Sequence, residues 1–189
     1  MGKKLTLFVI IGFWGFQAFA ESKEISSNNS FEEIDGNFPA NWTINNNLKP
    51  GTLQILSESA QDGKNYLMIK NDAKQVFHLY GALIAAAPGD VIRMSVYVKG
   101  TGTFRLGVYI CNRKNQHIKG IYPEAVKIES SDWQKKDFEI TMPCEEFKDK
   151  GCVAAIRPVI VVDSNSEINL DNFSGQIEKA ATDEINKRG

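Results

Sequence analysis

Two neighbouring segments of the chain, residues 91–99 and 104–111, alternate apolar and polar side chains with a period of two. Successive side chains of a β-strand point to opposite faces, so this period predicts two strands, each with one apolar face. Gly100-Thr101-Gly102, which separates them, predicts a turn. The pair therefore predicts a sheet with one face against a core and a polar-aromatic face outward.

Further short strand patterns, separated by turn residues, follow along the rest of the chain. We expect strands at 31–34, 41–44, 52–57, 66–69, 74–87, 126–128, 133–142, 153–162 and 167–177. Ser130-Ser131-Asp132 is predicted to be a turn. Roughly ten short strands and no convincing helix predict one all-β domain, either a sandwich or a jelly roll. A length of 189 residues fits a single domain.

The first 20 residues have the pattern of a cleaved secretion signal. Lys3 and Lys4 precede an apolar run that ends at Phe16, and Ala18-Phe19-Ala20 matches a cleavage site. We expect cleavage after Ala20 and a secreted or periplasmic protein, with an uncleaved N-terminal anchor as the alternative. The expected divisions are a signal peptide (1–20), a flexible leader (21–28), a β-sandwich domain (29–177) and a C-terminal tail (178–189).

Charge and cysteine content narrow the possible partners. The chain has 22 basic and 23 acidic residues, so its surface is close to neutral, which argues against nucleic acid. No segment after the leader approaches the length of a membrane span.

Export permits disulfides, and Cys144 and Cys152 flank a polar turn, so we expect a Cys144–Cys152 disulfide and a buried free thiol at Cys111. The spacing of these cysteines from His78 and His117 does not indicate a zinc site.

The sequence carries no motif of a known catalytic site. It lacks G-x-S-x-G, H-E-x-x-H and the phosphate-binding P-loop. A glycosidase needs two carboxylates at a set separation, and Glu124, Glu129 and Asp132 lie near turns without supporting residues. We therefore expect the protein not to be an enzyme.

Acidic residues accompany the strand patterns at both ends of the expected domain, in residues 29–33 and 167–173. If the first and last strands pair, these carboxylates come together. Clustered oxygen ligands suit a hard cation such as Ca²⁺.

Several short motifs occur in a recognisable order. They are Asn29-Ser30-Phe31-Glu32, Trp42-Thr43, Asp62-Gly63-Lys64, Pro88-Gly89-Asp90, Ser95-Val96-Tyr97-Val98-Lys99-Gly100, Arg105-Leu106-Gly107-Val108-Tyr109, Ser131-Asp132-Trp133-Gln134-Lys135 and Leu170-Asp171-Asn172-Phe173. Together they resemble the cellulose- and xylan-binding type of carbohydrate-binding module (families 4, 9, 16 and 22), in the galactose-binding-like jelly-roll superfamily. The resemblance spans residues 29–177.

The resemblance implies a β-sandwich jelly roll with a structural calcium ion and a sugar groove, on a sheet face or at a loop edge. It implies calcium ligands at Glu32 and Asp171, joined by Asp62, with backbone carbonyls near Asn29 and Asn65 completing the shell. The alternative is that these are surface carboxylates at strand ends. Similar modules are commonly joined to a glycoside hydrolase. A length of 189 residues leaves no room for one beside this domain, so we expect any such partner to be a separate protein.

A sugar site needs flat aromatic side chains for stacking and polar groups for directional hydrogen bonds. Strand parity predicts a shared outward face for Tyr97, Arg105, Tyr109 and Arg157, with Tyr80 joining from the preceding strand. The alternative is that these side chains are simply packed. We expect an exported, non-catalytic carbohydrate-binding domain; the alternatives are a protein-binding or adhesion domain and, least favoured, a hydrolase acting on glycosyl bonds.

The remaining large aromatic residues are expected to be structural. Apolar strand registers predict that four phenylalanines form core: Phe31, Phe104, Phe138 and Phe173. In similar modules, tryptophans at the positions of Trp42 and Trp133 are packing residues, so we expect the same here.

Overall fold

The computed structural model describes residues 22–25, 28–44, 52–147 and 150–180 of the 189-residue chain. These residues form β-strands and no helix, which confirms the predicted all-β class. No helix among them could cross a membrane. The predicted signal peptide, residues 1–20, lies outside the described residues.

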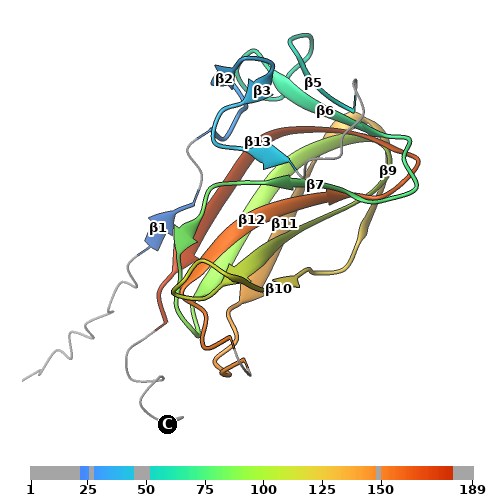
Figure 1. The fold of residues 1–189 in the computed structure, drawn as a ribbon. Helices are drawn as coiled ribbons and strands as arrows, with labels where there is room; N and C mark the ends of the chain where they lie inside the picture. Colours follow the sequence, from blue (N-terminus) through green and yellow to red (C-terminus); the bar gives the residue numbers. More distant parts are fainter. Residues whose placement is uncertain (1–21, 26–27, 45–51, 148–149, 181–189) are drawn as a thin grey trace, which may run out of the picture.

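The strands follow one another with short connections (Figure 1). They are β1 Ser22–Glu24, β2 Ile34–Asp35, β3 Phe38–Pro39, β4 Thr43–Ile44, β5 Leu53–Leu56, β6 Tyr66–Asn71, β7 Phe77–Tyr80, β8 Ile84–Ala85, β9 Val91–Cys111, β10 His117–Ile121, β11 Val126–Thr141, β12 Ala155–Val162 and β13 Ser166–Glu178.

The long strand β9 links two layers of an antiparallel sandwich. Its first half pairs with β13, and its second half pairs with β12. The back layer in Figure 1 contains β5, β6, β13, the first half of β9 and the second half of β11. The front layer contains β4, β7, β12 and the second half of β9, with β8 and β10 at its margins.

The turn predicted at Gly100-Thr101-Gly102 is wrong, because β9 bends there without reversing direction. Gly100 and Gly102 have φ angles of 124° and 134°, which L side chains rarely adopt. A Cβ at Gly100 would collide with the carbonyl oxygen of Glu167, and one at Gly102 with Ser166. The two glycines therefore allow the strand to turn the corner between the layers. The turn predicted at Ser130–Asp132 is likewise an irregularity within β11.

The core fills the space between the layers. The even-numbered residues of β9, from Ile92 to Ile110, belong to one buried cluster, apart from the corner. Phe104 of the front layer and Phe138 of β11 make a T-shaped contact, with ring centroids 6.0 Å apart. Phe31 and Phe173 are fully buried, so all four phenylalanines predicted to be core are confirmed.

The first and last described segments meet, but not through the strand predicted at 31–34. Phe31 has a φ of 55° and lies outside any strand. Instead β1, within the leader expected to be flexible (21–28), pairs with the end of β13. Ile25 is buried beside Gly175, where there is no room for a Cβ. Part of the predicted leader therefore belongs to the folded domain.

Candidate functional site

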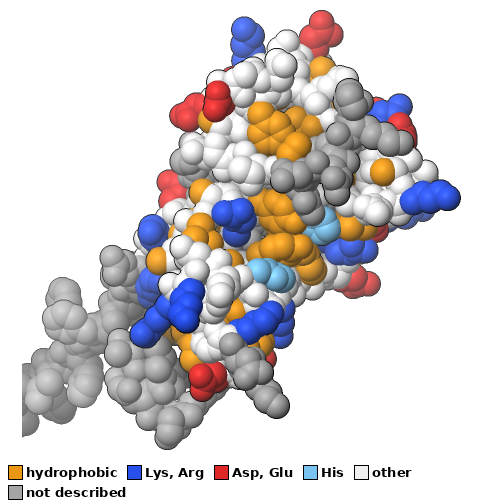
Figure 2. All heavy atoms as spheres, viewed as in Figure 1, with side chains coloured by type: hydrophobic (Ala, Val, Ile, Leu, Met, Phe, Trp, Pro, Cys, Tyr) orange, Lys and Arg blue, Asp and Glu red, His pale blue; other side chains and the backbone are white. Residues whose placement is uncertain are grey.

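Five aromatic side chains lie together on the outer surface of the front layer. We call this group the aromatic face; it consists of His78 and Tyr80 of β7, Tyr109 of β9, His117 of β10 and Tyr122. The rings of His78 and Tyr80 stack with a 5° interplanar angle. The ring centroid of Tyr109 lies 5.2 Å from that of Tyr80 and 4.5 Å from that of His117. Figure 2 shows the pale blue histidines among orange side chains at the centre of this surface.

Strand register brings these side chains together. On β12, Val159 is opposite Tyr80 on one side and Gly107 on the other. Because outward positions align across neighbouring strands, β7, β12 and β9 present one continuous surface. The Tyr122 ring covers Gly107, where a Cβ would collide with it. The missing side chain at Gly107 thus makes room for an aromatic ring.

The tyrosines of the aromatic face share hydrogen bonds. The side chains of Tyr80 and Tyr122 both hydrogen-bond with that of Tyr109. Burial, followed by these bonds, raises the pKa of Tyr80 and of Tyr122 well above the ordinary tyrosine value. The phenols of Tyr80 and Tyr122 therefore remain neutral and offer both flat rings and hydroxyl groups.

The two histidines are also held neutral. Burial is the main cause that lowers the pKa of His78, and the nearby charge of Arg105 lowers it further. The pKa of His117 is lowered by burial and then by Lys150. Protonation of either ring would place a charge where burial limits its hydration and beside an existing cation.

A hollow of about 300 Å³ opens within this surface. It is lined by Tyr80, Leu83, Tyr109, Cys111, Asn115, His117 and Arg157. Arg157 is directly opposite Tyr109 in the β12–β9 register. The hollow thus combines aromatic rings, an amide and a guanidinium, which suits a ligand with both apolar and hydroxyl surfaces.

The structure brings together three of the five predicted sugar ligands, namely Tyr80, Tyr109 and Arg157. Arg105 lies on the same strand face but forms an ion pair with Asp163, at 2.9 Å between Nη1 and Oδ1. Tyr97 is elsewhere, because it precedes the corner of β9 and pairs with Asp171 of the back layer.

His117 and Tyr122 were not predicted as site residues. They lie in or beside β10, a segment where we expected no strand. His117 and Lys119 flank the apolar Ile118, and this short alternation is the only signal that could have indicated a strand there.

The predicted calcium ligands lie where three segments of the chain meet. Glu32 accepts hydrogen bonds from the backbone N–H of Lys64 (2.6 Å) and of Asn65 (2.7 Å). Asp171 is fully buried and accepts bonds from the backbone N–H groups of Gln61, Asp62 and Asn172.

These residues only partly fit a calcium ion. Burial raises the pKa of Asp171 and the nearby Asp62 raises it further, against the lowering effect of its backbone hydrogen bonds. At the same junction the buried Oδ1 of Asn29 has no hydrogen-bond partner. Oxygen ligands and an uncompensated carboxylate favour a hard cation. However, no three His, Cys, Asp or Glu side chains of the described part are grouped closely enough to hold a metal.

The three cysteines are free thiols in the structure. Cys111 is buried, as predicted, and burial raises its pKa. Cys144 and Cys152 are exposed and unbonded, so the predicted disulfide is not formed in this structure. Cys111 has the outward parity of Tyr109, so its burial comes from the side chains around the hollow, and a polar connection between Cys144 and Cys152 does not ensure that they pair.

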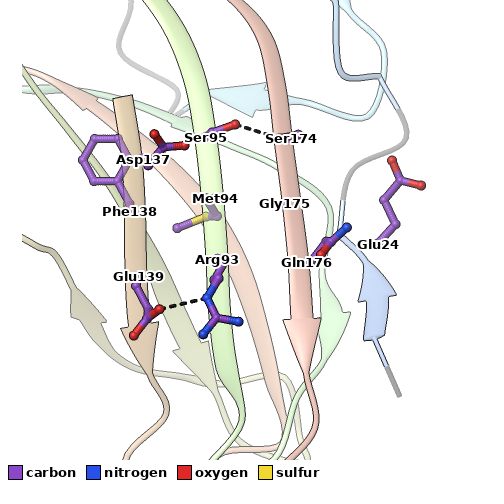
Figure 3. A pocket seen from close by; sticks show the side chains of 10 residues that line it. All are labelled: Glu24, Arg93, Met94, Ser95, Asp137, Phe138, Glu139, Ser174, Gly175 and Gln176. Carbon is purple, nitrogen blue, oxygen red and sulfur yellow. Dashed lines mark hydrogen bonds and ion pairs between the residues drawn. The ribbon is translucent and has the colours of Figure 1, made fainter. Parts of the chain in front are cut away.

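A second hollow, of about 610 Å³, lies on the outer surface of the back layer (Figure 3). Arg93 in this hollow pairs with Glu139 (Nε to Oε2, 2.8 Å) and with Glu178, and its Ser95 and Ser174 hydroxyls bond each other. Its only aromatic lining residue, Phe138, is buried in the core. This hollow therefore lacks a flat surface for stacking.

Trp42 and Trp133 are packing residues, as predicted. Trp42 lies between Phe31 and Phe173, with ring centroids 5.7 and 5.2 Å away. Trp133 contacts Tyr66, and its indole N–H donates to the carbonyl oxygen of Ser59 at 2.9 Å.

Comparison with known proteins finds solved structures with a similar fold. No family model and no curated protein matches the sequence. The CBM22-1 xylan-binding domain from Paenibacillus barcinonensis Xyn10C is 18% identical with a TM-score of 0.60, over 85% of this chain and 97% of that one. The chain has the jelly-roll fold of such domains. The predicted resemblance to carbohydrate-binding modules is confirmed at the level of the fold.

Two further structures show the range of proteins with this fold. The Clostridium thermocellum xylanase 10B CBM22-1-GH10 modules, complexed with xylohexaose, are 18% identical with a TM-score of 0.58, over 83% of this chain and 29% of that one. A cyclase from Fischerella sp. TAU is 14% identical with a TM-score of 0.58, over 86% of this chain and 100% of that one. The fold alone therefore does not determine the activity.

Proposed function

We propose that this protein is a non-catalytic carbohydrate-binding domain that holds a glycan on the aromatic face. The observation that carries the proposal is the hollow that Tyr80, Tyr109 and His117 line together with Arg157. The apolar C–H surface of a sugar ring can stack on such rings, while its hydroxyls bond to phenol, amide and guanidinium groups.

The composition of the site favours binding over catalysis. The lining of the hollow contains no aspartate or glutamate, so it has no pair of carboxylates for glycoside hydrolysis. The solved relatives that carry xylan-binding modules are consistent with a polysaccharide ligand, since they share the fold.

The proposal has three further parts. The signal-peptide pattern of residues 1–20 supports export to the periplasm or the medium. Glu32, Asp62 and Asp171, with oxygen from Asn29, would hold a structural calcium ion that ties the first and last segments of the domain together. A glycoside hydrolase that acts on the bound polysaccharide would be a functional partner.

The test is glycan binding by the Tyr109→Ala variant. Removing the ring at the centre of the aromatic face should weaken binding at least about tenfold, since a stacked aromatic contributes on the order of 1 kcal/mol or more beside its buried area. A glycan array followed by calorimetry measures the loss. The matched control is Tyr97→Ala, a half-buried tyrosine on the same strand but outside the aromatic face, which should bind normally.

Tyr109→Phe separates the contribution of the ring from that of the hydroxyl. It keeps the ring and removes only the hydroxyl that Tyr80 and Tyr122 share. We expect it to retain most of the binding. Absence of any glycan binding by the wild-type protein would contradict the proposal and favour a protein partner, and release of cleaved sugar would indicate a hydrolase.

A further inference from the structure

We propose that the aromatic face selects acidic glycans, and that Arg157 reads the carboxylate of a uronic acid unit. This inference rests on the proposed function and specifies its ligand. Arg157 is an outward residue of β12, half-buried at the wall of the 300 Å³ hollow.

Among the described residues, Arg157 is the strand arginine that no ion pair or side-chain hydrogen bond holds. Arg105 pairs with Asp163 at 2.9 Å, and Arg93 pairs with Glu139 and Glu178. Within the described part of the chain, no hydrogen bond or ion pair holds the guanidinium of Arg157. Its charge nevertheless acts on the hollow: burial raises the pKa of Tyr80 and of Cys111, and the nearby charge of Arg157 offsets part of each rise.

The surroundings of Arg157 are positive. Beside the hollow lies another, of about 380 Å³, lined by Asn112, Arg113, Lys114, Gln116, Lys150, Gly151 and Cys152. Among the described residues, neither lining includes an acidic side chain. Lys150 points its ammonium at the carbonyl oxygens of His117 (3.2 Å) and Ile118 (3.0 Å), next to the aromatic face. A chain of acidic sugars could thus follow a positive path from one hollow to the next.

Physical chemistry favours a carboxylate over a neutral sugar at this position. A guanidinium and a carboxylate can form two parallel charge-assisted hydrogen bonds, which are stronger than bonds between neutral groups. A neutral glycan that covers the hollow would remove water from Arg157 without supplying an opposite charge, which costs free energy. The same site therefore penalises neutral ligands and favours acidic ones.

The test compares two ligands that have the same sugar backbone and differ in charge. Oligogalacturonate and its fully methyl-esterified form have the same sugar rings, but only the first carries carboxylates. We expect calorimetry at low salt to show at least about tenfold tighter binding of the free acid. Salt should reduce the difference, because it screens charges at a partly exposed site.

Substitution of Arg157 by Gln should abolish the preference while preserving binding of the ester. Arg157→Lys keeps the charge without the planar fork and should retain part of the preference. Arg93→Gln, which removes an arginine from the back layer, is the matched control and should leave the preference unchanged. Melting temperatures of all variants confirm that each is folded.

The outcomes separate this inference from the proposed function. Equal affinity of the wild-type protein for the acid and the ester would overturn the acidic preference and leave the glycan-binding proposal standing. Failure of both ligands, together with the rest of a glycan array, would overturn both proposals. An equal loss of acid and ester binding in Arg157→Gln would show that Arg157 only shapes the hollow.

Discussion

The histidines of the aromatic face couple the stability of the front layer to pH. His78 has a lowered pKa because it is buried beside Tyr80 and near the charge of Arg105. The unfolded chain, in which histidine titrates near 6.5, therefore binds a proton more readily than the folded protein. The stability due to the neutral ring is fully present above pH 6.5 and declines as the pH falls from there toward the lowered pKa.

We predict that the free energy of unfolding falls between pH 7 and pH 5, and that His78→Gln makes this fall smaller. The glutamine has no charge to gain, so His117 and the other titratable groups, the buried Asp171 among them, still contribute to the slope. Urea unfolding of both proteins at several pH values measures the effect. An unchanged slope in the variant would show that His78 titrates normally in the folded protein.

At the scale of elements, the corner of β9 determines which surfaces the strand serves. Before Gly100 its outward residues lie on the back layer, and after Gly102 they lie on the front layer. Tyr97 and Tyr109 have the same parity on one strand, yet their side chains lie on the outer surfaces of different layers. The position of the corner therefore decides which aromatic side chains can form a site.

We predict that Gly100→Ala destabilises the protein by about 3 kcal/mol or more, because the new Cβ adds overpacking against the Glu167 backbone to a strained φ. Gly36→Ala is the matched control. Gly36 also has a positive φ, of 64°, but nothing lies within 4 Å of its added Cβ. This control should cost only about 1 kcal/mol. Denaturant titration compares the two, and similar losses would mean that the close approach at Gly100 is unimportant.

At the scale of the whole molecule, contacts between distant segments close the domain. β1 pairs with the end of β13, and the backbone N–H of Phe173 donates to the carbonyl oxygen of Asn29 at 2.7 Å. The loop at Gln61–Asp62 donates two backbone N–H groups to the buried Asp171. A cation at this junction would stabilise the closed form of the whole domain, because it would bind only when the three segments are together.

We predict that calcium raises the melting temperature by about 5–10 °C at a concentration 100 times its dissociation constant, as linkage requires for a domain of this size. EDTA should reverse the shift. Asp171→Asn should abolish it, whereas Asp137→Asn, which changes a carboxylate of the back-layer hollow, should not. A calcium shift of equal size in Asp171→Asn would place the ion elsewhere, and no shift in the wild-type protein would reject the calcium site. Differential scanning calorimetry measures all three proteins.

The sequence by itself determined the all-β class, the inward and outward parity of β9 and the burial of the four core phenylalanines. Those properties follow from the alternation of side chains along a strand, which is local. Tertiary structure alone decided that β9 runs through Gly100–Gly102, that β1 joins β13, and that His117 and Tyr122 share a surface with Tyr80 while Tyr97 does not. These depend on which strands are neighbours, and pairing between distant segments leaves little trace in the local pattern.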